Sequence, residues 1–181
     1  MSNPFVHLHV HSEYSLLDGA NRCRDLAQTT RDMGMGAVAL TDHGVMYGCV
    51  EFYKECQSAG VKPILGCEVY VAPSGHTCRE AKEQFHLILL AENDEGYHNL
   101  VKLVSIAYRY GFYYKPRIDL DFLAAHSEGL ICTTGCMAAD IPRAIGTTTD
   151  EYRLWLSPEQ LAGISALKLT LARLATGVPR R

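Results

Sequence analysis

The chain has 181 residues, of which 48% are hydrophobic and 20% are charged, a composition typical of an ordinary globular domain. Its net charge of -3 and its pI near 6.2 exclude a strongly basic, free-standing DNA-binding module. No apolar run approaches the roughly 20 residues that cross a bilayer, and the first residues lack a signal-peptide pattern. We therefore expect a cytoplasmic protein with no membrane partner.

The seven cysteines favour a reducing environment. Their number is odd and most of them lie inside apolar stretches, which suits free thiols better than a disulfide framework. Cys132 and Cys136 do not form a CxxC pair. The sequence therefore gives little support for a zinc ribbon or a redox motif.

Residues 5–19 combine an apolar alternation with three histidines. Alternate side chains of a strand point to opposite faces, so His7, His9 and His11 would share one face and the apolar residues between them the other. Neutral imidazole is a good ligand for zinc, manganese or iron. A purification tag would be an unbroken histidine run, and a plain polar strand face is the other alternative. The interleaved pattern, followed by an Asp18-Gly19 turn, favours a metal site.

The first half of the chain alternates strands with helices. Apolar spacing predicts, in order, a helix capped by Asn21 and ended by Gly34, a strand at 37–40, a helix from Cys49 to Gly60 and a strand at 63–71. Residues 73–84 are polar and contain Pro and Gly, which indicates an exposed loop. The strand-helix-strand order implies right-handed crossovers and a parallel sheet.

The second half continues this alternation. We expect a strand at 85–90, a helix capped by Asn93 or Asp94, a break at 111–117, a short helix capped by Asp119 and a strand at 129–133. On the longer helix one stripe is interpreted as core packing: Tyr97, Leu100, Val101, Val104 and Tyr108. Residues 146–150 look like a linker, and a capping box at 157–160 predicts a helix to about Leu174.

These elements predict an α/β fold with about five parallel strands. In parallel barrels the loops after the C-terminal strand ends build the active site. Polar residues recur at these ends or in the loops that follow: His9, His11, Asp18, Asp42, His43, Glu68, His86 and Cys136. Satisfied core histidines would not fall so regularly at strand ends.

Several motifs resemble one family. They are His-Leu-His-Val-His-Ser at 7–12, Leu-Thr-Asp-His-Gly at 40–44 and Lys-Pro-Ile-Leu-Gly-Cys-Glu-Val-Tyr-Val at 62–71. They are similar to the polymerase and histidinol phosphatase (PHP) domain. The segments at 47–53 and 111–119 resemble more closely the copy at the N-terminus of the bacterial replicative DNA polymerase III alpha subunits. The resemblance covers residues 4 to about 145.

The resemblance implies a distorted seven-stranded (β/α) barrel that holds up to three zinc or manganese ions. Transferred position by position, it assigns His9 and His11 to the first metal, Glu68 to a bridge between two metals, His86 to the second, and Asp18 with His43 to the third. His7 stands where an Asp is common in the family and is expected to support the ligands rather than to bind metal. Cys136 stands where many members have a histidine ligand, and its thiolate is a zinc ligand too.

The resemblance also sets the expected domain limits. Residues 1–145 would form a truncated PHP domain, and residues 146–181 a linker and helical tail unlike the family. The Asp-x-His motif that completes two of the metal sites in active members does not occur after residue 145. The barrel would therefore be incomplete. The magnesium-binding carboxylates of the polymerase region would also be missing, so the chain alone would not copy DNA.

Three functions remain open from the sequence. The first is a metal-dependent phosphoesterase or 3'-5' proofreading exonuclease with Glu68, His43 and Asp42 as catalytic residues, weak or inactive in this chain. The second is a non-catalytic module that braces the polymerase and contacts a proofreading subunit or other replicase subunits, with DNA bound through the parent polymerase. The third is a stand-alone phosphatase of histidinol-phosphate type, which the segments at 47–53 and 111–119 disfavour.

Overall fold

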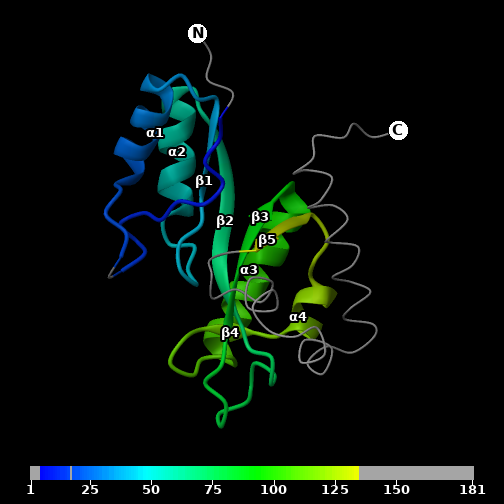
Figure 1. Ribbon diagram of the computed structural model, residues 1–181. Coiled ribbons are helices and arrows are strands. Elements are labelled where there is room, and N and C mark those ends of the chain that lie inside the picture. Colours follow the sequence, from blue (N-terminus) through cyan, green and yellow to red (C-terminus); the bar gives the residue numbers. More distant parts are fainter. Residues whose placement is uncertain (1–4, 17, 135–181) are drawn as a thin grey trace, which may run out of the picture.

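The computed structural model describes residues 5–16 and 18–134 (Figure 1). Its elements in chain order are α1 (Cys23–Asp32), β1 (Ala37–Leu40), α2 (Cys49–Ala59), β2 (Lys62–Val71), β3 (Phe85–Ala91), α3 (Asp94–Arg109), β4 (Arg117–Ile118), α4 (Leu120–Ala125) and β5 (Leu130–Thr134). Apart from the opening strand, the predicted strands and helices up to residue 133 are confirmed to within a few residues, and β4 is an addition. Cys136, the linker and the tail helix lie outside the described residues.

The sheet is mixed, with most strands running in the same direction. Its order is β1-β2-β3-β5, and β4 pairs with the far end of β2. β2 is parallel to β1 and β4, whereas β3 is antiparallel to both β2 and β5. The prediction of a parallel sheet is therefore wrong for β3. Because residues 72–84 contain no helix, the chain makes no crossover there and returns beside β2 in the opposite direction.

The opening segment, residues 5–16, does not form the predicted regular strand. It runs beside β1 and contacts it through an isolated bridge between His7 and Val38. The main-chain N–H groups of Ala39 and Thr41 donate to the carbonyls of His7 and Val10, at 2.8 and 2.9 Å. The Val10 N–H donates to the Thr41 hydroxyl and not to a main-chain carbonyl. A side chain thus takes the place of one ladder bond, and no continuous ladder forms.

Helices cover two parts of the sheet. Figure 1 shows α1 and α2 side by side next to β1, and α3 against the strands at the other end of the sheet. One core cluster joins α1, α2 and β1: Cys23, Ala27, Val38, Leu40, Cys49, Phe52, Cys56 and Val61. A second lies between α3 and β2, β3, β4 and β5: Cys67, Val69, Val71, Leu89, Leu100, Leu103, Ala107, Ile118 and Cys132. A small third cluster contains Ala39, Ile88 and Leu90.

Two details of the helices differ from prediction. α1 has Arg22 at its N-cap, and Asn21 instead donates its side-chain N–H to the His11 carbonyl at 2.8 Å. On α3, Val101 and Tyr108 are exposed, while Leu103 is fully buried. The buried face of α3 follows Leu100, Leu103 and Ala107, so the stripe predicted from the sequence was rotated toward solvent.

The remaining sequence expectations concern thiols and membranes. Within the described residues six cysteines are present, and all are free. Burial raises the pKa of the Cys49 thiol to about 12, so it stays protonated. Among the helices of this part of the chain, none combines the length and apolar character needed to span a bilayer.

Candidate metal centre

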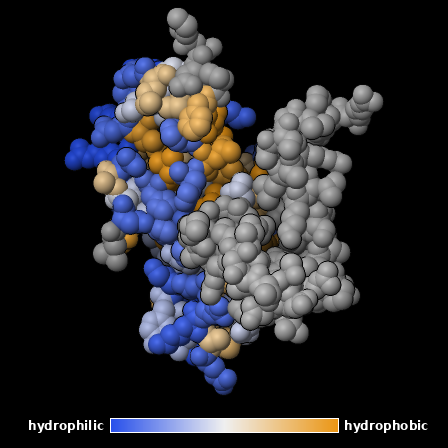
Figure 2. Space-filling model, in the orientation of Figure 1, coloured by the Kyte–Doolittle hydropathy of each residue, from blue (hydrophilic) through white to orange (hydrophobic). Residues whose placement is uncertain are grey.

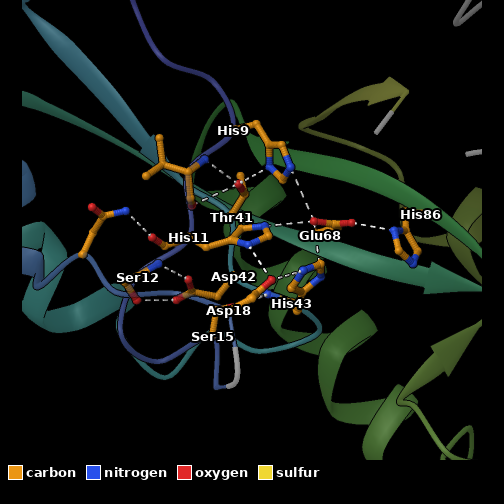
Figure 3. Close-up of polar contacts among 12 residues, drawn as sticks. His9, His11, Ser12, Ser15, Asp18, Thr41, Asp42, His43, Glu68 and His86 are labelled. Atoms are coloured by element: carbon orange, nitrogen blue, oxygen red, sulfur yellow. Dashed lines mark hydrogen bonds and ion pairs between the residues drawn. The ribbon is translucent and has the colours of Figure 1, made fainter. Parts of the chain in front are cut away.

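Glu68 is the centre of the site. It lies in β2, and its side chain is 3% exposed. The main chain that follows β1 hydrogen-bonds to the main chain of Glu68. The Glu68 N–H donates to the Asp42 carbonyl, and the Gly44 N–H donates to the Glu68 carbonyl. Four imidazoles surround the carboxylate of Glu68, and Asp18 lies beside two of them (Figure 3). We call this set the histidine cluster: His9, His11, Asp18, His43, Glu68 and His86.

His9 presents one particular ring nitrogen to Glu68. Its Nδ1 lies 2.8 Å from the Thr41 hydroxyl oxygen, which also accepts from the Val10 N–H and donates to the Val10 carbonyl. A hydroxyl has a single proton to donate, so when Thr41 donates to the Val10 carbonyl, His9 Nδ1 is the donor in its bond to Thr41. The unprotonated Nε2 of neutral His9 then faces Glu68 Oε2 at 3.5 Å. Burial lowers the pKa of His9 despite the opposing charge of Glu68, and this favours the neutral ring.

His11 lies between two carboxylates. Its Nε2 is 2.9 Å from Glu68 Oε2, and its Nδ1 is 3.2 Å from Asp18 Oδ2. The hydrogen bond to Glu68, followed by the charge of Asp18, raises the pKa of His11 against the effect of burial. The raised pKa favours the form of His11 that donates to both acids and carries a positive charge, which a bound metal would replace.

His43 lies on the other side of Asp18. Its Nε2 is 2.6 Å from Asp18 Oδ2, and its Nδ1 is 3.3 Å from Glu68 Oε2. Nδ1 is buried and makes no hydrogen bond within the described structure. With the ring proton on Nε2 toward Asp18, Nδ1 offers a free lone pair toward the Glu68 carboxylate.

The two carboxylates are held in their charged forms. Burial would raise the pKa of Glu68, but hydrogen bonds from His11 and His86 outweigh it and hold this pKa far below its ordinary value. Burial likewise opposes ionisation of Asp18, and a hydrogen bond from Ser15 and the charges of His43 and His11 lower its pKa. Both side chains are therefore anionic at neutral pH.

His86 enters the cluster from the first residues of β3. Its Nδ1 lies 2.7 Å from Glu68 Oε1, the oxygen that the other three histidines do not face. Because β3 runs against β2, the beginning of β3 lies at the edge where the parallel strands end. The strand direction that was predicted wrongly thus explains how His86 joins residues from the ends of other strands.

The structure does not bring every predicted site residue into this cluster. Asp42 is buried, and its carboxylate accepts from Ser12, at 2.6 Å from the N–H and 2.8 Å from the hydroxyl. His7 is exposed and packs edge-on against Phe5, with ring centroids 4.8 Å apart. Cys136 lies outside the described residues.

Three supporting residues were not singled out from the sequence. Thr41 orients His9, and the Ser15 hydroxyl accepts from the His43 main-chain N–H at 3.1 Å. The Tyr70 ring stacks on His43 and meets His86 edge-on. Thr41 and Tyr70 both stand within recognised motifs two residues from a predicted ligand, and that position was the available signal.

The donor set fits a transition metal such as zinc or manganese. Two groups of three residues have ligand atoms within 4.8 Å of one another, namely His9, His11 and Glu68, and His11, Asp18 and His43. His86 and Glu68 form a further pair on the other carboxylate oxygen. Imidazole with carboxylate is a typical set for these metals. The lone pairs of His9 Nε2 and His43 Nδ1 both face an anionic oxygen, which a cation between them would satisfy.

Comparison with known proteins agrees with this geometry. The family model described as the PHP domain matches residues 7–164. This match extends past residue 145, where the sequence predicted the domain to end, so that boundary stays a prediction. DNA polymerase III subunit alpha of Borreliella burgdorferi is 52% identical over 145 residues, which are 78% of this chain and 13% of the relative. The Treponema pallidum protein of the same name is 51% identical over 76% of this chain and 12% of its own length.

Solved structures give a weaker likeness. The match to the structure of an amidohydrolase from Chromobacterium violaceum covers 76% of this chain and 43% of the amidohydrolase chain, with 18% identity and a TM-score of 0.41. The family assignment therefore rests on the sequence comparisons. The PHP model covers most of the chain, and the curated relatives match over about an eighth of their length. This chain belongs to the PHP domain family and matches the DNA polymerase III alpha subunits within it.

Proposed function

We propose that the histidine cluster is a metal-dependent phosphoester-hydrolysing centre, of phosphoesterase or 3'-5' exonuclease type. The observation that carries the proposal is the Glu68 carboxylate, which is buried and faces imidazoles on both of its oxygens. Such a carboxylate can bridge two metal ions. The membership in the PHP family and the identity to polymerase alpha subunits support this assignment.

The residues of the chain would divide the work as follows. Zinc or manganese, when bound, would supply Lewis acidity and a nucleophilic water. His9 and His11 hold ligand nitrogens toward Glu68, and Asp18 keeps the proton of His43 on Nε2. His9 and Asp18 have side chains 43% and 42% exposed, so a phosphate can approach from their side. Asp42 is assigned a positioning role in place of the catalytic one predicted, because both of its oxygens are bound by Ser12.

The finer expectations form part of the same proposal. The sheet is taken as a portion of a distorted seven-stranded barrel. His7 packs against Phe5 and not against the cluster, and its role in supporting the ligands stays a prediction. The protein is placed in the bacterial cytoplasm, where it contacts DNA and other replicase subunits through the parent polymerase. The names of the curated relatives support this reading.

A non-catalytic role is the second candidate, and one observation favours it. The cluster joins four parts of the chain: the opening segment, the turn that follows β1, strand β2 and strand β3. The opening segment is far from β2 and β3 in sequence. A metal at this point would act as a staple between them.

One experiment separates the two roles. Metal content is measured on purified protein that has never been exposed to a chelator. Hydrolysis is followed with added manganese or zinc, on a 3'-labelled oligonucleotide and on a small phosphomonoester. We expect at least one ion per chain and slow turnover that is lost on His43→Ala but kept on His98→Ala, a change at an exposed histidine of α3. Bound metal without turnover would favour the structural role. A metal content near zero, unchanged by His9→Ala, would overturn both.

A further inference from the structure

The segment 108–117 is rich in exposed aromatic rings. It contains five aromatic and three basic residues and no acidic one. Tyr110, Phe112 and Tyr114 are 46%, 51% and 67% exposed, which is unusual for such large rings. Tyr114 also has a left-handed φ of 61°, a conformation that non-glycine residues rarely adopt and that is concentrated at functional sites. The segment therefore presents flat apolar surfaces to solvent.

Cations accompany these rings. Lys82 Nζ lies 4.4 Å from the centroid of the Tyr114 ring, and the Arg79 guanidinium lies 5.9 Å from that of Tyr113. Lys82 and Arg79 come from the loop 72–84, and Figure 1 places this loop and segment 108–117 at the same end of the molecule. On the face seen in Figure 2, that end carries mainly hydrophilic and intermediate colours, whereas the hydrophobic colours gather near the opposite end.

This surface reaches the histidine cluster through Lys115. Lys115 is exposed, and its Nζ lies 5.3 Å from the centroid of the Tyr70 ring. The other side of the contact is the cluster itself, because Tyr70 stacks on His43, with ring planes 11° apart, and contacts His86. Pro116 packs against Gly44, the residue after His43, where a Cβ would lie 2.8 Å from the proline ring. Segment 108–117 is thus fixed beside the cluster.

We propose that segment 108–117 with Lys82 binds single-stranded DNA, and that Lys115 holds a backbone phosphate next to the metal centre. Exposed rings stack on bases regardless of sequence, and cations placed among them bind the backbone. The inference rests on the proposed function and names its substrate class as the end of an oligonucleotide rather than a small phosphomonoester. Tyr114, Phe112 and Tyr110 carry the bases, and Lys115 is the first phosphate contact outside the cluster.

The local charge allows this contact although the whole chain carries a net charge of -3. Within residues 5–16 and 18–134, neither Lys82 nor Lys115 takes part in an ion pair, so both ammonium groups are available to phosphate. Glu80 and Glu83 are the acidic neighbours of Lys82 in the loop 72–84.

Binding is measured separately from hydrolysis. Fluorescence anisotropy of a labelled single-stranded oligodeoxythymidylate is followed at low salt with EDTA present, using the full 181-residue chain. We expect Lys115→Ala and Tyr114→Ala each to weaken binding by about fivefold or more. Lys115→Ala should also reduce the slope of log affinity against log salt by about 0.7, the contribution of one phosphate contact. Lys115→Arg should retain most of the binding.

Matched controls use the same residue types at exposed positions away from the proposed DNA-binding surface. Lys62→Ala changes an exposed lysine at the opposite end of β2, and Tyr53→Ala changes a partly exposed tyrosine of α2. Both should bind like the unaltered chain. Absence of binding, equal loss in the controls, or an unchanged salt slope in Lys115→Ala would overturn the inference, and a protein partner would then be the better occupant. The binding assay contains EDTA and so does not depend on metal. If DNA binds at this surface but the separate assay with added manganese or zinc shows no hydrolysis, the proposed function alone is refuted. Hydrolysis of the small phosphomonoester without DNA binding would refute this inference alone.

Discussion

Thr41 and Asp42 are adjacent in the chain and both are buried, yet their side chains contact different residues around the histidine cluster. Thr41 fixes the ring of His9 through its hydroxyl, and Asp42 binds Ser12 at the end of the opening segment. Neither residue faces a space where a substrate would lie. Their contribution is orientation, and such supporting contacts determine how well a ligand nitrogen is presented.

Replacing Thr41 with valine should weaken metal binding. Valine keeps the shape of threonine but removes the acceptor for His9 Nδ1, so the proton and orientation of that ring are no longer fixed. We expect metal affinity to fall about 10- to 100-fold, measured by competition with a chromophoric chelator. Thr77→Val, at an exposed position of the loop 72–84, is the control and should leave affinity unchanged. Equal affinity of Thr41→Val and the unaltered chain would contradict the role given to Thr41.

Asp42 substitutions should affect stability more than turnover. Asp42→Ala removes the acceptor for the buried N–H and hydroxyl of Ser12 and should lower the free energy of unfolding by about 2–4 kcal/mol. Asp42→Asn keeps one acceptor and should cost about 1 kcal/mol, as judged by denaturant titration. If Asp42 were a catalytic base, Asp42→Asn would abolish hydrolysis while the protein remained folded, and that result would restore the catalytic role predicted from the sequence.

At the scale of elements, the loop 72–84 is held by β4 and the start of α4 rather than by secondary structure of its own. Arg117 of β4 is buried, and its guanidinium donates to three carbonyls of this loop, those of His76, Cys78 and Ala81. Asp119 caps α4 by accepting from the Phe122 N–H at 2.9 Å and also accepts from the His76 N–H at 3.1 Å. The polar loop is therefore ordered by two side chains.

The Asp119 contribution should depend on pH. Burial would raise the pKa of Asp119, but hydrogen bonds from Phe122 and His76 lower it below its ordinary value of 3.8. The stabilisation from the charged carboxylate is thus fully present above pH 3.8 and is lost as the pH falls through the lowered value. We expect Asp119→Ala to cost about 1–2 kcal/mol at pH 7, and the difference from the unaltered chain to shrink below pH 3.8. Unfolding curves across this range test it. Asp119→Asn keeps the cap without the charge, and a pH dependence equal to that of the unaltered chain would contradict this account.

At the scale of the whole molecule, the histidine cluster joins the opening segment to β2 and β3 through side chains. His11 and Glu68 are 57 residues apart in the chain, and the opening segment contacts β1 through an isolated bridge, scattered hydrogen bonds and the packing of Val10 against the core cluster of α1, α2 and β1. Without metal, the two carboxylates raise the pKa of His11 between them, which favours a positive charge on its ring. A bound cation would replace that charge and tie the opening segment to β2.

Metal should therefore stabilise the fold, and Glu68 should be required for this effect. Zinc or manganese at about 100 times its dissociation constant adds about 2.7 kcal/mol to the free energy of unfolding and should raise the thermal midpoint measured by circular dichroism. Chelator should reverse the shift, and Glu68→Gln should abolish it because the buried anion is lost. A shift of equal size in Glu68→Gln would place the metal elsewhere.

Much of the site was predictable because it lies in short motifs. His9, His11, His43, Glu68 and His86 were all predicted from their positions at strand ends or from the family resemblance, and the structure brings them together. Their metal-binding roles stay predictions. The support from Thr41 was missed because the hydroxyl's partner is 32 residues away, a separation to which local periodicity is blind.

The parts of the fold that were wrongly predicted share a physical cause. Alternation in β3 indicates a strand but carries no information about its direction, which depends on pairing with β2 and β5. The face of α3 is likewise decided by what it packs against, and Val101 is apolar but points away from the sheet. Asn21 is a good capping residue, yet its amide is used by the His11 carbonyl. In each case a long-range contact outweighed a local preference.

The separation between the opening segment and its partners also sets an order of events during synthesis. His9 and His11 leave the ribosome well before Glu68 and His86, so their imidazoles have no carboxylate to contact until β2 and β3 have emerged. The β2–β3 pair is joined by the loop 72–84, whereas the contact between His11 and Glu68 spans 57 residues. The opening segment can meet β1 before β2 has emerged, and the metal centre is completed only when Glu68 and His86 join histidines that are already made.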